Sequence, residues 1–136
     1  MGTPLFDNEM PPALPKEVLG PGTAVLAGFA LDREDELLVS LKLVLEQSPF
    51  RNMITPGGFR MSVAMSNCGP LGWVTDRTGY RYSGIDPLTN LAWPEMPQAF
   101  RKLAESAANE AGFPNFVPDA CLINRYEPRT PASTRG

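Results

Sequence analysis

The sequence predicts an α+β fold, in which two amphipathic helices flank a long region of short strands and turns. Apolar residues recur at helical spacing in two segments, one beginning after Asp32 and one after Pro97. Between these segments, a Pro-Gly-Gly turn leads into a stretch of alternating side chains from Phe59 to Met65. The two periodicities together indicate helices and antiparallel strands rather than an all-helical or all-β chain.

The N-terminal part is expected to begin loosely and then form a strand and a helix. Residues 1–19 read as a loose leader because prolines interrupt any regular element. A strand is predicted from Thr23 to Phe29, and Asp32 is expected to cap the first helix. That helix should end by Ser48, because Pro49 disfavours helical geometry in the residue before it. Its apolar stripe consists of Leu37, Leu38, Leu41, Val44 and Leu45.

The central region should reverse at Pro56-Gly57-Gly58, since proline presets the first turn residue and glycine tolerates positive φ. In the predicted strand after this turn, alternate residues share one face: Phe59, Met61, Val63 and Met65.

The C-terminal part is predicted to contain the second helix and one further strand. The helix should open at Pro97, which suits a first helical position, and close at Gly112 and Pro114. The final strand is predicted from Cys121 to Tyr126. The 15 prolines and 12 glycines make up about a fifth of the 136 residues, so irregular structure should be extensive.

The charge is unevenly distributed, although the net charge is only −3. Residues 50–82 contain four arginines and one acidic residue, whereas residues 1–49 contain eight acidic and three basic residues. The positive segment could contact nucleic-acid phosphates, or it could be a solvated rim. Charge alone favours neither interpretation.

The absence of histidine limits the chemistry of these 136 residues. It excludes Ser-His-Asp and Cys-His nucleophiles, as well as an iron site of two histidines and a carboxylate. Cys68 and Cys121 lie far apart in the sequence and indicate neither a zinc site nor a disulfide framework. No signal peptide and no apolar run long enough to span a membrane is visible, so we expect a cytoplasmic protein without a membrane partner.

Several motifs between residues 20 and 128 resemble one family closely. They include the Ser48–Trp73 segment with its Pro-Gly-Gly turn, Gly79-Tyr80-Arg81-Tyr82, Ile85-Asp86-Pro87, Trp93-Pro94 and Asn124-Arg125-Tyr126. These motifs are similar to the N-terminal part of the AlkB family, the iron(II)- and 2-oxoglutarate-dependent dioxygenases that remove alkyl groups from DNA bases. The resemblance implies a nucleotide-recognition lid at about residues 48–96, two buttressing helices and the first strands of a double-stranded β-helix (jelly roll).

The resemblance also implies roles for individual residues. An aromatic face holds a flipped base by stacking, without reading sequence. Substrate contacts are assigned to Thr55, Met61, Met65, Trp73, Tyr80, Arg81 and Tyr82. Contacts to 2-oxoglutarate are assigned to Asn124, Arg125 and Tyr126, although Arg125 should face away from the other two. Trp73 and the two methionines could instead be core residues.

The family oxidises the alkyl carbon with iron(II), oxygen and 2-oxoglutarate, and an aldehyde leaves the repaired base. Its metal-binding His-x-Asp pair follows the Asn-Arg-Tyr strand, whereas residues 129–136 form a tail unrelated to that pattern. We therefore expect no catalytic or metal-binding residue here, and an inactive form produced by truncation or by a shift of reading frame near codon 128.

The substrate class implied is alkylated single- or double-stranded DNA, or RNA, with no protein partner. The alternative is a non-enzymatic module that binds single-stranded nucleic acid. With part of the jelly roll missing, we expect the Cys121–Tyr126 edge to be unpaired and the chain to be loosely packed.

Overall fold

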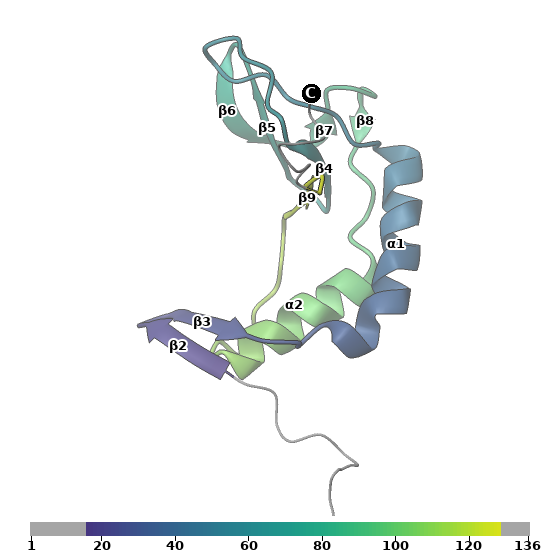
Figure 1. Ribbon diagram of the computed structural model, residues 1–136. Coiled ribbons are helices and arrows are strands. Elements are labelled where there is room, and N and C mark those ends of the chain that lie inside the picture. Colours follow the sequence, from purple (N-terminus) through teal and green to yellow (C-terminus); the bar gives the residue numbers. More distant parts are fainter. Residues whose placement is uncertain (1–15, 129–136) are drawn as a thin grey trace, which may run out of the picture.

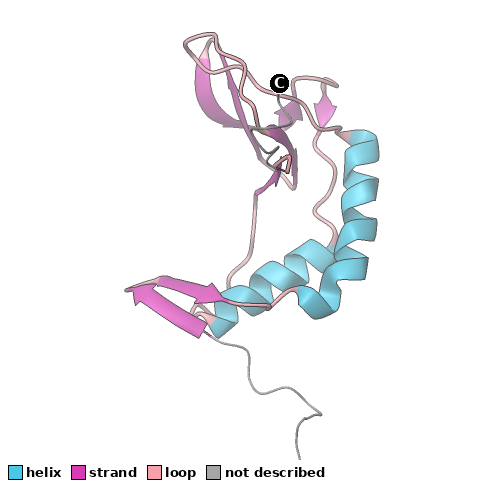
Figure 2. Ribbon diagram, in the orientation of Figure 1, coloured by secondary structure: helices cyan, strands magenta, loops and turns pink. Residues whose placement is uncertain are grey.

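The computed structural model describes residues 16–128 and contains two α-helices among short antiparallel strands (Figures 1 and 2). The helices are α1 (Glu34–Gln47) and α2 (Gln98–Glu110). The strands form four antiparallel pairs, which are β2 (Lys16–Gly20) with β3 (Thr23–Leu26), β4 (Ala64–Cys68) with β9 (Cys121–Arg125), β5 (Gly72–Asp76) with β6 (Gly79–Ser83), and β7 (Ile85–Asp86) with β8 (Leu91–Ala92). The prediction of mixed helices and antiparallel strands is confirmed. The jelly-roll assignment stays a prediction.

The elements lie in two groups joined by α1 (Figure 1). The pairs β4–β9, β5–β6 and β7–β8 gather near the C-terminal end of α1. Helix α2 crosses near the N-terminal end of α1. The β2–β3 hairpin lies beside the C-terminal end of α2, where the Lys16 ammonium donates to the Glu110 carbonyl oxygen at 3.1 Å. Helix α1 therefore links the strand pairs to α2 and the β2–β3 hairpin.

Three predictions for the N-terminal part need correction. Lys16–Gly20 is strand β2 rather than part of a loose leader, because Gly22, at φ +75°, lets the chain turn back into β3. Strand β3 ends at Leu26, before the predicted Phe29. Asp32 lies inside a short 3₁₀ turn, Leu31–Arg33, and does not cap α1. The helix ends as predicted, with the Ser48 N–H donating to the Val44 carbonyl oxygen at 2.9 Å.

The strand predicted from Phe59 to Met65 is wrong in its position. The Pro-Gly-Gly turn forms as predicted, closed by a 2.8 Å hydrogen bond from the Gly58 N–H to the Thr55 carbonyl oxygen. The chain after it remains irregular, Phe59 is 76 % exposed, and the strand β4 begins at Ala64. All five residues of β4 are buried, so its sequence lacks the alternation that marks a half-exposed strand.

Helix α2 and the strand after it agree with the sequence, apart from details at their ends. Pro97 stands just outside α2. Gly112, at φ +97°, closes the helix as predicted: its N–H donates to the Asn109 carbonyl oxygen, and the Phe113 N–H reaches Ala108. Strand β9 ends at Arg125 and pairs with β4 along its whole length. The expectation of an unpaired edge at Cys121–Tyr126 is therefore wrong on the β4 side.

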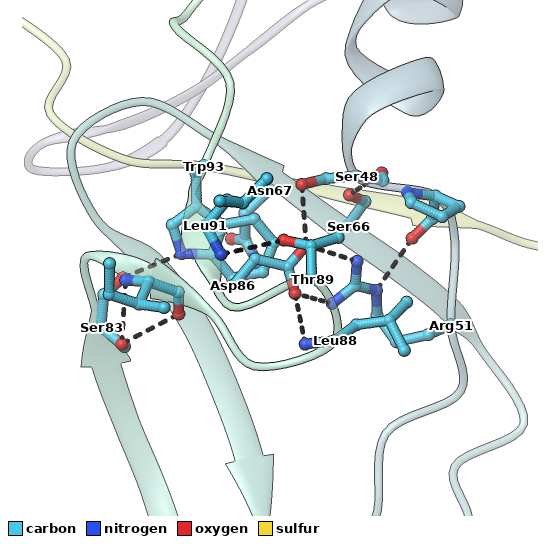
Figure 3. A network of polar contacts seen from close by, with 12 residues as sticks. Ser48, Arg51, Ser66, Asn67, Ser83, Asp86, Leu88, Thr89, Leu91 and Trp93 are labelled. Atoms are coloured by element: carbon cyan, nitrogen blue, oxygen red, sulfur yellow. Dashed lines mark hydrogen bonds and ion pairs between the residues drawn. The ribbon is translucent and has the colours of Figure 1, made fainter.

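A buried carboxylate joins α1 to the strand pairs (Figure 3). Asp86 is fully buried and accepts hydrogen bonds from the Ser48 hydroxyl at 2.7 Å and from the Leu88 N–H at 2.8 Å. The Arg51 guanidinium binds both carboxylate oxygens, at 2.7 and 2.8 Å. Burial acts to raise the pKa of Asp86, but the hydrogen bonds from Arg51, Ser48 and Leu88 outweigh it and lower the pKa overall.

We predict that Asp86→Asn destabilises the chain by about 3–5 kcal/mol, since it leaves the Arg51 charge buried without its partner. Because the folded-state pKa of Asp86 is lowered, the stability from its ionisation is present above the unfolded value of about 3.9 and is lost as the pH falls through the folded value. Urea midpoints between pH 7 and pH 3 should therefore fall with acid in the wild-type chain, and less steeply in the variant.

The control is Asp76→Asn, which breaks an ion pair between half-exposed side chains and should change the midpoint little. Equal loss of stability in the two variants would contradict the assignment of Asp86 as the structural carboxylate.

Candidate functional site

The β5–β6 hairpin gathers three predicted substrate residues on one face. Its register places Trp73 opposite Tyr82 and Thr75 opposite Tyr80, so these four side chains point the same way. The ring of Trp73 stacks on that of Tyr80, with 5.7 Å between the ring centroids and 28° between the planes. Tyr80 and Tyr82 are each 63 % exposed, whereas Trp73 is half-buried against a core of Met53, Met65, Val74 and Trp93. The hairpin thus presents an open aromatic face backed by packed core residues.

Asn67 holds Trp73 in place, a role that the sequence analysis missed. The buried amide of Asn67 donates to the Trp73 carbonyl oxygen at 2.9 Å and accepts from the Trp73 N–H at 3.0 Å. This one side chain on β4 therefore hydrogen-bonds both backbone groups of Trp73 on β5. A signal was available in the sequence, since a buried strand residue with an amide side chain needs hydrogen-bond partners.

The indole of Trp93 packs directly against the backbone of Gly72, the residue before Trp73. A Cβ atom added at Gly72 would overlap that indole, so only glycine fits at this position. The Trp93 indole N–H in turn donates to the Ser83 carbonyl oxygen on β6, at 2.9 Å (Figure 3). The hairpin is therefore fastened to the core at both strands.

Three of the other residues predicted to contact substrate are not on the β5–β6 hairpin. Met65 is a buried core residue of β4, and Met61 packs partly against the same cluster. The Thr55 hydroxyl accepts from the Phe59 N–H at 3.1 Å and so stabilises the turn. The structure thus places Met65 in the core, Met61 at its edge and Thr55 in a turn.

Arg81 does not join Trp73, Tyr80 and Tyr82. It lies opposite Val74, on the other face of the hairpin, where its guanidinium binds the carboxylate of Asp76 at 2.9 Å. Hydrogen bonds from Arg81, and then from Thr78, hold the pKa of Asp76 well below its usual range. The structure therefore shows Arg81 bound to Asp76 in the hairpin turn, and its substrate contact stays a prediction.

Two of the other three arginines of the positive segment have hydrogen-bond partners in the same chain. Arg51 is committed to Asp86, and Arg60 donates to the Asn52 side-chain oxygen at 3.0 Å. Arg77 lies over the Pro-Gly-Gly turn, where its guanidinium would meet a Cβ added at Gly58. Of the four arginines in this segment, Arg51 and Arg81 are therefore neutralised by carboxylates.

Two predicted 2-oxoglutarate residues are exposed, Asn124 on strand β9 and Tyr126 just after it. The Asn124 amide donates to the Tyr126 hydroxyl at 3.1 Å, and both residues are exposed. Asn124 lies opposite Met65, on the face of β4–β9 from which Asn67 reaches β5. Arg125 points away, with its guanidinium 4.8 Å from the Phe50 ring centroid and 3.3 Å from the Glu127 carboxylate. The structure thus separates Arg125 from the other two.

The residues present do not fit an iron site of two histidines and a carboxylate. The 136 residues contain no histidine. Between residues 16 and 128, no three residues among the cysteines, aspartates and glutamates cluster closely enough to hold a metal ion. In the same range, neither helix is long and apolar enough to cross a bilayer.

Comparison with known proteins gives a family and several relatives. The sequence profile of the 2OG-Fe(II) oxygenase superfamily matches residues 22–133. The alpha-ketoglutarate-dependent dioxygenase AlkB of Escherichia coli is 56 % identical over 113 residues, which cover 83 % of this chain and 52 % of that protein. The AlkB of Salmonella typhimurium is 52 % identical over 124 residues, covering 91 % of this chain and 56 % of the relative. An AlkB homolog of Caulobacter vibrioides is 41 % identical over 107 residues, covering 78 % and 47 %. The chain thus spans about half the length of the curated relatives it matches.

We predict that Asn67→Leu speeds hydrogen exchange at the Trp73 amide and lowers stability by about 1–3 kcal/mol, because two buried backbone groups lose their partner. Amide exchange followed by NMR measures the first effect, and a urea midpoint measures the second. The matched control is Asn52→Leu, since the amide of Asn52 bonds the carbonyl oxygens of Met61 and Ser62 at the edge of the fold. Unchanged exchange at Trp73 in the Asn67 variant would show that the amide does not position it.

Proposed function

Because the chain belongs to the AlkB family within the 2OG-Fe(II) oxygenase superfamily, we propose that it is the substrate-contacting part of an oxidative dealkylation enzyme. The family uses iron(II) and 2-oxoglutarate, as the names of the superfamily and of the relatives state. The proposed substrates are alkylated bases in single- or double-stranded DNA, or in RNA. The binding-module alternative receives no support from the relatives, all of which are named as dioxygenases.

The stacked pair of Trp73 and Tyr80 is the observation that carries this proposal. An enzyme that acts on a base must take it out of the helical stack and hold it against an apolar or aromatic surface. Tyr80 and Tyr82 are largely exposed, so their rings are open to a base and their hydroxyls to a phosphate. Asn67 fixes the backbone of Trp73, so the platform is ordered before a ligand arrives.

We place one edge of the 2-oxoglutarate site at Asn124 and Tyr126. Their exposed amide and phenol groups are hydrogen-bond donors suited to the carboxylate and ketone oxygens of that molecule. Arg125 is left out of this edge, since its guanidinium lies over Phe50. Met65 supports the assignment, because it is a neighbour of both proposed sites. Met65 is directly opposite Asn124 in the β4–β9 pair. It also belongs to the core cluster against which Trp73 packs.

We further propose that the iron ligands are not among these 136 residues, since the chain offers no imidazole. The purified chain, supplied with iron(II), 2-oxoglutarate and a methylated oligonucleotide, should release no formaldehyde above a metal-free control. The Escherichia coli relative, assayed in parallel, serves as the positive control. Formaldehyde above the metal-free control would show that the chain holds a working iron site.

For substrate contact, we predict that Trp73→Ala weakens binding of a fluorescent methylated single strand by about 5- to 140-fold, the loss of one stacked base. Fluorescence anisotropy titration of the purified chain gives the dissociation constants. Phe116→Ala is the matched control, because Phe116 is an aromatic residue, 46 % exposed, outside the β5–β6 hairpin. If both substitutions weakened binding of the strand equally, or if neither weakened it, the hairpin would be excluded as the nucleic-acid interface.

A further inference from the structure

The fold brings together two cysteines that the sequence separates. Cys68 and Cys121 are directly opposite each other at one end of the β4–β9 pair. Opposed residues of an antiparallel pair have Cα atoms about 4.5–5.5 Å apart, and their side chains leave the same face. Disulfides usually join Cα atoms about 4.4–6.8 Å apart. The backbone therefore already has the spacing that a bond between the two sulfur atoms requires.

The two thiols differ in access and in acidity. Cys68 is fully buried against Val44 and Met96, whereas Cys121 lies at the edge of that cluster and is partly exposed. A hydrogen bond from the Cys68 thiol lowers the pKa of Cys121. Hydrogen bonding to Cys121, and then burial, raise the pKa of Cys68. Cys121 is therefore the thiol that an oxidant reaches and the one that ionises first, and the thiolate is the reactive form.

We propose that Cys68 and Cys121 form a peroxide-oxidisable thiol pair that closes to a disulfide between β4 and β9. The Cys121 thiolate attacks one oxygen of hydrogen peroxide, the O–O bond breaks, and hydroxide leaves, so the sulfur becomes a sulfenic acid. The Cys68 sulfur then attacks the Cys121 sulfur, and the oxygen leaves as water with the Cys68 proton. In total, two thiols lose two electrons and one peroxide is reduced to two waters.

This disulfide would join the two strands that carry Met65 and Asn124. It would also close the long loop between residues 68 and 121, which contains the whole β5–β6 hairpin and α2. Closing such a loop restricts the unfolded chain, so the oxidised protein should have a higher urea midpoint than the reduced protein.

The test is limited oxidation of the purified chain in native buffer by hydrogen peroxide, read by intact mass and by counting free thiols. We expect the main product to be a monomer lighter by two hydrogen atoms, with both thiols lost and both regained on reduction. Accumulation of sulfinic acid or of covalent dimers, in place of that monomer, would overturn the proposal.

The matched control carries Cys121→Ser together with Leu122→Cys. This change moves the thiol by one position onto the opposite face of β9, where it is opposite Asn67. The control should give sulfinic acid or dimers, with intramolecular closure slower by at least about tenfold. Closure as fast as in the wild-type chain would show that the cross-strand geometry does not direct the bond.

Discussion

The buried carboxylate of Asp86 is the interaction on which the arrangement of α1 and the strand pairs depends. It binds Ser48 at the end of α1, the side chain of Arg51 and the backbone of Leu88. Taking a carboxylate out of water is costly, and the cost is offset here because every oxygen has a donor. Arg51 also lies 5.3 Å from the Trp93 ring centroid, and Trp93 binds β6 and covers Gly72. A continuous series of contacts thus runs from the end of a helix to the aromatic hairpin.

The hairpin at the end of this series is hydrogen-bonded to the core and has an open aromatic face. One strand is held by Trp93 and the other by Asn67, while the rings of Tyr80 and Tyr82 stay exposed. A ligand that stacks on this face would not need to order it first, which lowers the entropic cost of binding. Of the arginines nearby, Arg51 and Arg81 are paired with carboxylates of the same chain.

Several elements could be predicted because their determinants are local. The Pro-Gly-Gly reversal, the end of α1 before Pro49 and the closure of α2 at Gly112 each depend on a few neighbouring residues. The strand predicted from Phe59 failed because an alternating pattern also arises in an irregular segment that contacts the core intermittently. Strand β4 carries no alternation, since helices cover one face and the β5–β6 hairpin lies against the other.

By itself, the sequence determined the family, the two helices, the main turns and an inventory of side chains that contains no histidine. These properties depend on residue types and on motifs of adjacent residues, so they can be predicted without knowing the fold. The tertiary structure decided which arginines are neutralised, that Asn67 fastens Trp73, and that Cys68 meets Cys121. Each of these depends on the register between distant strands, and a shift of one residue would send every side chain to the opposite face. The register between distant strands cannot be predicted from the composition of the chain or from the spacing of its residues.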